Sequence, residues 1–280
     1  MPGPIPLELT GLSKTFQTPE GPFVAVENVN AVIQEGEFVC ILGHSGCGKS
    51  TVLSIIAGLQ RATLGGVVID GTEVDEPGAD RGVVFQSPSL LPWLTARQNV
   101  ALAMKQGRLM GKGRDSRTHR LRQGFGGQEV LRHNVTEYLE LVGAADCADQ
   151  MPNELSLGTQ QCVSLARALS LEPRFLLLDE PFSMLDSLTR FELQDTLLQV
   201  WERHRKTVVM VTHDVDEALY LADRLILMTD GPAATVGEIL TVPFPRPRER
   251  TAVLEHAECY ASHQRVIDFL ENHARQSRAS

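Results

Sequence analysis

The residues from Gly43 to Ser50 follow the pattern glycine, four residues, glycine, lysine, serine. An apolar run at residues 37–42 precedes them and a helical pattern at residues 50–59 follows, so a strand, a loop and a helix are expected in this order. In such a loop, backbone N–H groups and the helix start surround a phosphate, and the Lys49 ammonium adds a full positive charge. The Ser50 hydroxyl is a ligand for Mg²⁺. The residues expected to contact nucleotide phosphates are Gly43, His44, Ser45, Gly46, Cys47, Gly48, Lys49, Ser50 and Thr51.

Two adjacent carboxylates, Asp179 and Glu180, end a second apolar run that begins at Phe175. The carboxyl ends of parallel strands meet at one edge of a sheet, so we expect this pair at the edge that carries the phosphate loop. Hydrolysis of a nucleotide needs one group that orients the metal and another that activates water. We expect Asp179 to organise Mg²⁺ and its water, and Glu180 to polarise the attacking water.

Cys47 lies inside the predicted loop, close to Lys49 and to the helix start. Both features favour a thiolate, so the sequence predicts a reactive thiol that Mg·ATP protects. The chain has five cysteines in all, an odd number without a CxxC pair, and we interpret them as reduced thiols.

Apolar, β-prone runs alternate with helical patterns along much of the chain, which predicts an α/β fold with a mostly parallel core sheet. Residues 5–12 and 24–33 are interpreted as antiparallel strands at the edge of that sheet, forming an antiparallel β subdomain. Helical periodicity dominates residues 95–171, which indicates an inserted helical subdomain. The main domain is expected to cover residues 5–245, and residues 246–280 are expected to form a C-terminal helical extension.

Residues 105–133 form a basic insertion within this helical region. The insertion has eight Lys or Arg, two acidic residues and six glycines, a composition typical of a mobile loop. Two interpretations remain open, a docking site for anionic lipid or a partner protein, and a solvated basic loop.

The overall composition of the 280-residue chain narrows the function classes. Hydrophobic residues make up 42% and charged residues 22%, which is typical of a globular protein. The 26 Lys and Arg against 35 Asp and Glu give a net charge of −9, so a nucleic-acid partner is not expected. No apolar run approaches roughly 18 residues and the first ten residues do not resemble a signal peptide, so we expect the protein in the cytosol.

Residues 7–245 resemble the ATP-binding subunits of ATP-binding cassette (ABC) transporters. The resemblance is carried by the phosphate loop, by the carboxylate pair and by Phe16, Gln86, Asp186 and His213. The resemblance implies a P-loop ABC ATPase fold with ATP and Mg²⁺ as ligands. It implies that Gln86 contacts Mg²⁺ and senses the membrane subunit, and that His213 contacts the γ-phosphate and assists catalysis by Glu180 and Lys49. It also implies that Phe16 stacks on adenine and that Asp186 crosses a dimer interface.

The family's signature segment, usually Leu-Ser-Gly-Gly-Gln, corresponds to residues 155–159, which read Leu-Ser-Leu-Gly-Thr. The side chain of Leu157 would crowd the approach of a nucleotide held by the partner subunit. Ser156 and Gly158 are retained, so we expect function to survive. The residues that the resemblance assigns to the signature and the dimer interface are Leu155, Ser156, Gly158, Gln160 and Asp186.

The phosphate loop together with residues 85–95 resembles the bacterial importer group for nitrate, bicarbonate, cyanate, sulfonates and taurine. In that group, the segment after Gln86 meets a coupling helix of the permease. Such a contact would explain the apolar residues Leu91 and Trp93 near a surface. Packing of both residues in the core remains an open alternative.

The resemblance implies a subunit that hydrolyses ATP to energise import of a small anion, peripheral on the cytoplasmic face of the inner (plasma) membrane. Its implied partners are a second ATPase subunit, identical or a close paralogue, and a transmembrane permease. A periplasmic or lipid-anchored binding protein would capture the substrate. Two alternatives stay open: a weakly hydrolysing regulatory subunit, because of Leu157 and Thr159, and a soluble cassette ATPase outside transport.

Overall fold

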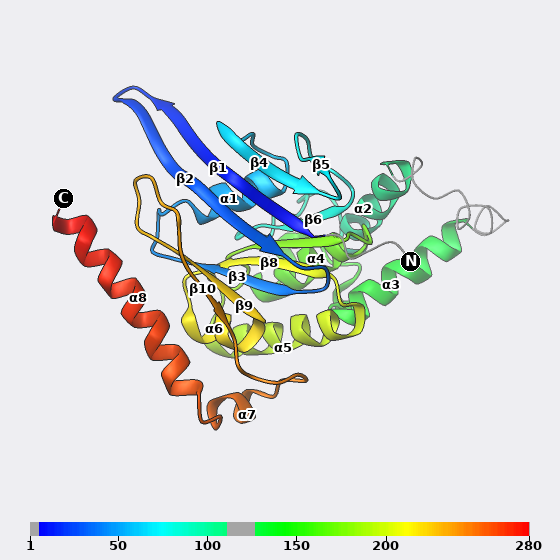
Figure 1. Cartoon of the computed structure of the whole chain (residues 1–280). Helices are drawn as coiled ribbons and strands as arrows, with labels where there is room; N and C mark the ends of the chain where they lie inside the picture. The colour runs from blue at the N-terminus through cyan, green and yellow to red at the C-terminus, as the bar shows by residue number, and fades with distance from the viewer. Residues whose placement is uncertain (1–5, 111–126, 280) are drawn as a thin grey trace. The chain divides into compact units, whose positions relative to one another are not determined.

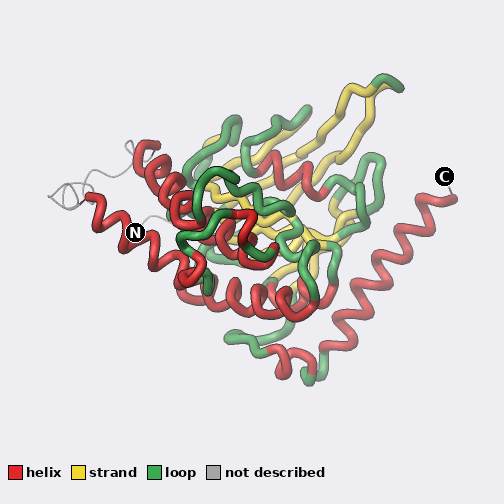
Figure 2. Tube along the Cα trace, turned by 180° about the vertical axis from the view of Figure 1, so that it is seen from behind, coloured by secondary structure: helices red, strands yellow, loops and turns green. Residues whose placement is uncertain are grey.

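A computed structural model of the chain describes residues 6–110 and 127–279. Two compact units make up the chain: unit 1 comprises residues 1–78, 177–180 and 205–280, and unit 2 comprises residues 79–176 and 181–204. Strands and helices alternate along much of the chain, as the sequence predicted; Figure 2 distinguishes them by colour. Most of the predicted basic insertion at residues 105–133 lies outside the described residues.

Unit 1 contains an antiparallel sheet with the strand order β2-β1-β4-β5. Its strands are β1 Leu7–Thr18, β2 Gly21–Ile33, β4 Leu64–Ile69 and β5 Thr72–Glu73. The strands β1 and β2 form the long blue hairpin of Figure 1. The predicted antiparallel β subdomain is therefore present. Its expected place at the edge of the parallel sheet was wrong, because β1 pairs with β2 and β4 in a separate sheet, and the Leu-Gly-Gly start of β4 gave no clear strand signal.

The second sheet has the order β10-β9-β3-β8-β7 within unit 1. These strands are β10 Val236–Thr241, β9 Arg224–Met228, β3 Phe38–Leu42, β8 Thr207–Thr212 and β7 Phe175–Asp179. Strand β3 pairs in parallel with β8 and β9, whereas β10 is antiparallel to β9. Every residue of β3 and β8 is buried, as in strands covered on both faces. The predicted α/β fold with a mostly parallel core sheet is therefore confirmed.

The helices of unit 1 are α1 Lys49–Ile56, α6 Val215–Leu221, α7 Arg250–Leu254 and α8 Cys259–Ala279. Helix α6 begins at an Asp214 cap, whose carboxylate accepts from the backbone N–H of Glu217. At its other end, the buried Arg248 guanidinium donates to the carbonyls of Leu219, Tyr220 and Ala222. These carbonyls lack partners within the helix, so Arg248 closes the end of α6 and ties the following segment to it.

Unit 2 is mainly helical. It contains β6 Arg81–Val84, α2 Ala96–Met110, α3 Gly127–Leu141, α4 Leu157–Leu169, α5 Ser187–His204, and the short 3₁₀ turns Ala145–Cys147 and Pro152–Glu154. The first two residues of β7 also belong to this unit, and β6 follows β7 in the strand order. Helix α4 packs against α2, α3, α5 and β6, so its buried face, including Val163 and Ala166, forms the centre of the unit.

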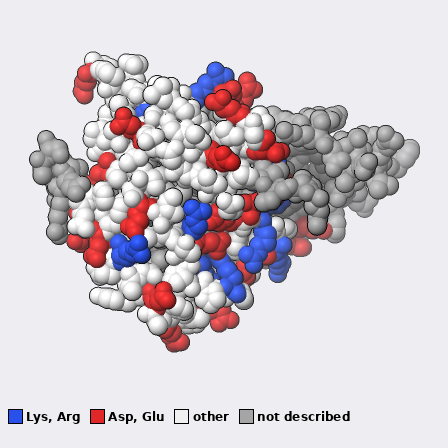
Figure 3. Space-filling model, viewed as in Figure 1, with Lys and Arg blue, Asp and Glu red and all other residues white. Residues whose placement is uncertain are grey.

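The described residues, 6–110 and 127–279, include no helix long and apolar enough to cross a membrane. On the face shown in Figure 3, Lys and Arg side chains are interspersed with Asp and Glu rather than gathered into one patch.

Candidate nucleotide site

The loop between β3 and α1 has the backbone form that a phosphate cradle requires. Gly46 and Gly48 have φ of +82° and +97°, a region that residues with a side chain rarely adopt. A Cβ on Gly48 would lie 2.4 Å from Cγ1 of Val26, whereas a Cβ on Gly46 would enter open space. Gly48 is also the N-cap of α1 and has no side chain to occupy the first-turn N–H groups, which leaves them for an anion.

Lys49 lies across this loop. Its ammonium group donates to the carbonyls of Gly43 and His44, each at 2.8 Å, and only 4% of the residue is exposed. The Lys49 charge therefore lies against the backbone of the loop, next to the space that the loop surrounds. An anion in that space would meet both a full charge and N–H donors, which fits a phosphate.

The hydroxyl of Ser50, at the start of α1, meets the end of β7. Its Oγ donates to Oδ1 of Asp179 at 2.7 Å. Burial raises the pKa of Asp179, although the hydrogen bond from Ser50 and the charge of Lys49 oppose this effect. One hydroxyl and one carboxylate are the kind of oxygen ligands that Mg²⁺ takes from a protein when phosphates and water complete its shell.

Glu180 and His213 lie next to each other beyond the ends of β7 and β8. Oε2 of Glu180 is 3.3 Å from Nδ1 of His213. The backbone N–H of Glu180 donates to the carbonyl of Val211, which ties the residue to β8, and its φ of +44° is unusual for a residue with a side chain. Such strained positions cluster at functional sites. The structure thus brings Lys49, Ser50, Asp179, Glu180 and His213 together in unit 1.

Phe16, by contrast, is carried by the antiparallel sheet of unit 1. It pairs in register with Phe23 on β2, and its ring is half-buried. The Lys14 ammonium lies 5.2 Å from the ring centre, within the range of a cation–π contact.

The remaining predicted residues belong to unit 2. Gln86 follows β6, and its amide donates to the hydroxyl of Ser183 at 3.1 Å. Asp186 caps α5: its carboxylate accepts from the backbone N–H of Leu188 and from the N–H and hydroxyl of Thr189. The hydrogen bond from the Thr189 hydroxyl is the main reason that the pKa of Asp186 is lowered.

The predicted signature segment forms the start of α4. Ser156 is the N-cap, and its Oγ accepts from the backbone N–H of Thr159 at 3.1 Å. A Cβ on Gly158 would lie 2.3 Å from Cγ2 of Thr189, so only glycine allows the starts of α4 and α5 to meet. Leu155 is buried, Leu157 is half-buried, and the side chain of Gln160 donates to the carbonyl of Leu155.

The segment after Gln86 is held by donors on α4. Gln161, 2% exposed, donates to the carbonyl of Phe85 at 3.1 Å. Arg167 donates to the carbonyls of Ser89 and Pro88 at 2.7 and 3.2 Å, and burial lowers its pKa. Trp93 in the same segment is 68% exposed. Core packing of Trp93, one of the two alternatives, is therefore wrong, whereas Leu91 is half-buried.

A comparison with family models matches residues 26–183 to the family described as ABC transporter. This chain belongs to that family. It is 50% identical over 259 residues to the nitrate import ATP-binding protein NrtD of Synechococcus elongatus, which covers 92% of this chain and 89% of the relative. The bicarbonate transport ATP-binding protein CmpD of the same organism is 47% identical, covering 95% and 90%. The nitrate transport protein NasD of Klebsiella oxytoca is 46% identical, covering 94% and 95%.

Among solved structures, the cassette is similar to the ATP-binding cassette MJ0796 in a dimeric post-hydrolysis state bound to ADP and Pi. The TM-score is 0.71 at 35% identity, over 85% of this chain and 100% of that chain. The family membership and these likenesses agree with the loop geometry: the cassette binds nucleotide and is an ATPase.

Asp230 is a residue of this cassette site that sequence reasoning missed. Its Oδ1 lies 2.6 Å from Nδ1 of His44, the second residue of the phosphate loop. The next residue, Gly231, would place a Cβ 3.6 Å from the carbonyl of Gly46, so the turn after β9 lies against the loop. Asp230 is 186 residues from His44, and no local motif marks it.

The prediction of a reactive Cys47 thiolate is not supported by the cassette's structure. The residue is 1% exposed, and its Sγ would lie 2.7 Å from a Cβ on Gly43. Burial raises the pKa of the Cys47 thiol, and this effect outweighs the charge and backbone N–H of Lys49, which lower it. The thiol is therefore buried against Gly43.

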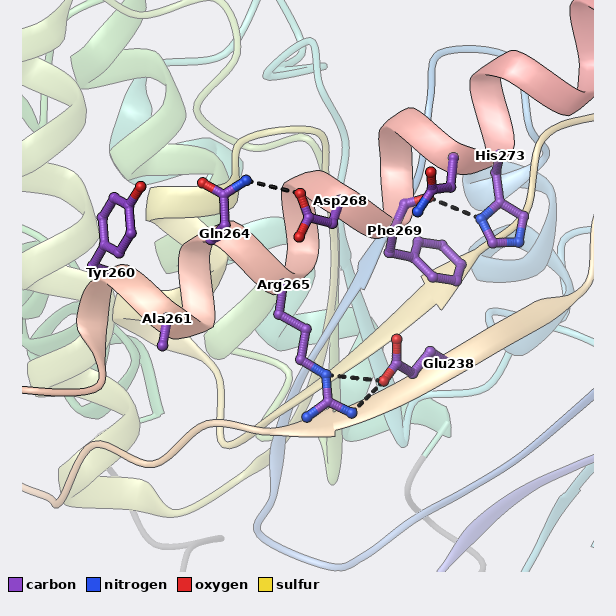
Figure 4. A pocket seen from close by; sticks show the side chains of 9 residues that line it. Glu238, Tyr260, Ala261, Gln264, Arg265, Asp268, Phe269 and His273 are labelled. Carbon is purple, nitrogen blue, oxygen red and sulfur yellow. Dashed lines mark hydrogen bonds and ion pairs between the residues drawn. The ribbon is translucent and has the colours of Figure 1, made fainter.

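A shallow groove of about 530 Å³ lies between β10 and α8 of the cassette, well separated in the chain from the phosphate loop (Figure 4). Arg265 crosses it from α8 to Glu238 on β10, and Gln264 donates to Asp268 along the helix. None of the residues that line it belongs to the predicted nucleotide site.

Proposed function

We propose that this chain is the ATP-hydrolysing subunit of an importer for a small planar oxyanion, of the nitrate or bicarbonate kind. The observation that carries the proposal is the pairing of Glu180 with His213 beside the Ser50–Asp179 contact, in a chain about half identical to a nitrate import ATP-binding protein. The bicarbonate relative matches nearly as well over the same length. Both anions are small and planar, which is why we name this class in place of the wider group with sulfonates and taurine.

The residues that meet at the phosphate loop of unit 1 have distinct proposed tasks in hydrolysis. Gly46, Gly48 and the first turn of α1 would bind the phosphates with N–H donors, and Lys49 would neutralise charge on them. Ser50 and Asp179, already in contact, would hold Mg²⁺. Mg²⁺ supplies charge that stabilises the leaving phosphate oxygens.

Glu180 is proposed as the group that accepts the proton of the attacking water. Its carboxylate is 21% exposed, so water reaches it, and its position is fixed by the N–H bond to Val211. His213 is 58% exposed in its side chain and would donate from its ring to the γ-phosphate while its other nitrogen faces Glu180. The pair would therefore orient water on one side and phosphate on the other.

A second ATPase subunit, either an identical copy or a close paralogue, is proposed to complete the site. The solved MJ0796 cassette is dimeric, which supports this arrangement. Ser156 is exposed at the start of α4, where first-turn N–H groups and the helix dipole favour an anion. We propose that this segment and Asp186 face the nucleotide and loop of the partner.

A permease is the proposed partner of the segment after Gln86. Trp93 is 68% exposed, which is unusual for so large an apolar side chain unless a partner covers it. The bonds from Gln161 and Arg167 fix the backbone that carries it. This contact would hold the cassette at the cytoplasmic face of the plasma membrane, with a separate binding protein that captures the anion.

Reconstitution tests the proposed function. The chain would be purified together with the permease and binding protein of its transporter and placed in proteoliposomes, and ATP hydrolysis would be measured with nitrate, bicarbonate or taurine. We expect nitrate or bicarbonate to stimulate hydrolysis severalfold and taurine to leave it unchanged. Stimulation by taurine alone would contradict the substrate class, and hydrolysis absent under all conditions would contradict the enzymatic role and favour a regulatory subunit.

A further inference from the structure

Two hydroxyl groups at the start of α4 are bonded to each other. Oγ of Ser156 lies 2.9 Å from Oγ1 of Thr159, and the same Oγ accepts from the backbone N–H of Thr159 at 3.1 Å. Ser156 is exposed and Thr159 is half-buried. Thr159 stands at the signature position where the resembled family usually has glutamine, and the sequence pattern assigned it no contact.

The number of hydrogens and lone pairs limits how this pair can be arranged. A hydroxyl has one hydrogen and two acceptor positions. The backbone N–H of Thr159 fills one acceptor position of Ser156. If Thr159 donates its hydroxyl hydrogen to Ser156, both acceptor positions are filled and the Ser156 hydrogen must point away from α4. If Ser156 donates instead, its only hydrogen is used within the helix turn.

The carbonyls next to the pair already accept hydrogen bonds from Gln160. Gln160 already donates its side-chain amide to the carbonyl of Leu155 at 3.1 Å and its backbone N–H to the carbonyl of Ser156 at 2.9 Å. Between Oγ of Ser156 and Oγ1 of Thr159 the 2.9 Å separation allows either hydroxyl to donate, and we take Thr159 as the donor.

Contacts with α5 also fix the helix turn that carries Ser156 and Thr159. Gly158 lies against the Thr189 methyl group so closely that a Cβ would come within 2.3 Å of it. Thr189 in turn donates its hydroxyl to Asp186 at 2.7 Å. A turn fixed in this way gives the outward Ser156 hydrogen a defined direction.

We propose that Thr159 is a positioning residue that donates to Ser156 and so directs the Ser156 hydrogen toward the terminal phosphate of the nucleotide on a second copy of the chain. The inference rests on the proposed function. Phosphate oxygens of bound MgATP accept hydrogen bonds and do not donate, so only this arrangement of the two hydroxyls gives Ser156 a bond to the anion.

The test measures ATP-dependent association of the purified chain. Glu180→Gln serves as the parent, because slowed hydrolysis lets the ATP-bound dimer accumulate, and light scattering after gel filtration gives the dimer fraction at each MgATP concentration. Thr159→Val removes the hydroxyl but keeps the branched side chain and the backbone N–H bond to Ser156. We expect it to raise the ATP concentration for half-maximal dimer about three- to tenfold, as for a hydrogen bond of typical net strength.

Three further variants show whether the effect comes from the hydroxyl. Thr159→Ser, which keeps a hydroxyl, should restore dimerisation to within threefold of the parent. Thr196→Val removes a threonine hydroxyl that bonds the Glu192 carbonyl on α5, and should change nothing. Ser156→Ala should weaken the dimer at least as much as Thr159→Val and also lower the melting temperature, because it removes the helix cap, whereas Thr159→Val should leave the melting temperature within about 2 °C.

The outcomes separate this inference from the proposed function. The proposed role of Thr159 is overturned if Thr159→Val dimerises like the parent, or if Thr159→Ser is as defective as Thr159→Val. Either result leaves the proposed function standing. If Thr159→Val fails to fold, Thr159→Ala is compared with Thr159→Ser in the same assay and read in the same way. A parent that forms no dimer with MgATP overturns the proposed pairing of two copies, and the inference falls with it.

Discussion

Alanine at Gly48 and at Gly46 should have different effects, although both glycines lie in the phosphate loop with positive φ. Placing a residue with a side chain at φ of +97° or +82° costs about 1–2 kcal/mol in either case. At Gly48 the new Cβ would also lie 2.4 Å from Cγ1 of Val26, far inside the 3.5–4.0 Å of an ordinary carbon contact. Forcing such an overlap in a packed site costs a further 1–3 kcal/mol or so.

The expected free energies of unfolding follow from these terms. Gly46→Ala should lower the free energy of unfolding by about 1–2 kcal/mol, and Gly48→Ala by about 2–5 kcal/mol. Because the backbone cost is common to both, their difference isolates the contact with Val26. Combining Gly48→Ala with Val26→Ala should recover about 1–3 kcal/mol relative to the sum of the single effects.

Urea unfolding of the four variants and the wild type measures these differences. Binding of a fluorescent ATP analogue adds a second comparison. The Cβ of Gly46→Ala would enter the space proposed for phosphate, so this variant should lose more binding free energy than unfolding free energy. The reasoning is refuted if Gly48→Ala is no less stable than Gly46→Ala. It is also refuted if the double variant Gly48→Ala/Val26→Ala is no more stable than the sum of the two single effects predicts.

Three further predictions concern residues around the site. Leu157→Gly should lower the melting temperature by a few degrees, as about 1–2 kcal/mol of packing and helix propensity is lost, without faster ATP turnover; faster turnover with unchanged stability would show that Leu157 crowds the nucleotide. Iodoacetamide should react with Cys47 more slowly than with a free thiol at pH 7.5 and faster as pH rises, because the raised pKa keeps the thiol protonated; rapid reaction at pH 7.5, lost in Cys47→Ala, would contradict this. Arg248→Met should destabilise the chain by about 3–5 kcal/mol in urea, because the carbonyls at the end of α6 lose their buried donor, and a loss below about 1 kcal/mol would show that water replaces it.

Local sequence predicted the phosphate loop and the carboxylate pair because each lies at the end of a buried strand. An uninterrupted apolar run such as residues 38–42 indicates a strand covered on both faces, and the order of such strands in a parallel sheet sets where their ends meet. That rule places Ser50 and Asp179 at the same edge of the sheet, but their direct contact across 129 residues depends on the fold, since β8 lies between β3 and β7 in the strand order.

Other features depend on contacts that no local pattern contains. Strand β4 begins with Leu-Gly-Gly and lacks a clear alternation, so the antiparallel β subdomain was predicted without β4 and β5 and at the edge of the parallel sheet. The approach of Asp230 to His44 is set by the turn after β9, and the burial of Cys47 by Gly43 above it. The pairing of Thr159 with Ser156 is local, but it depends on a hydroxyl geometry that spacing alone does not reveal.

The proposed role of Glu180 is the central claim of this account, and steady-state ATP hydrolysis by Glu180→Gln tests it most directly. The amide keeps the shape of the side chain but cannot accept a proton from water, so turnover should fall by about 10²-fold or more while ATP binding stays within a few-fold of wild type. Glu20→Gln, at the exposed turn of the β1–β2 hairpin, is the matched control and should hydrolyse ATP at the wild-type rate. Unchanged turnover in Glu180→Gln would contradict the assignment of the catalytic base.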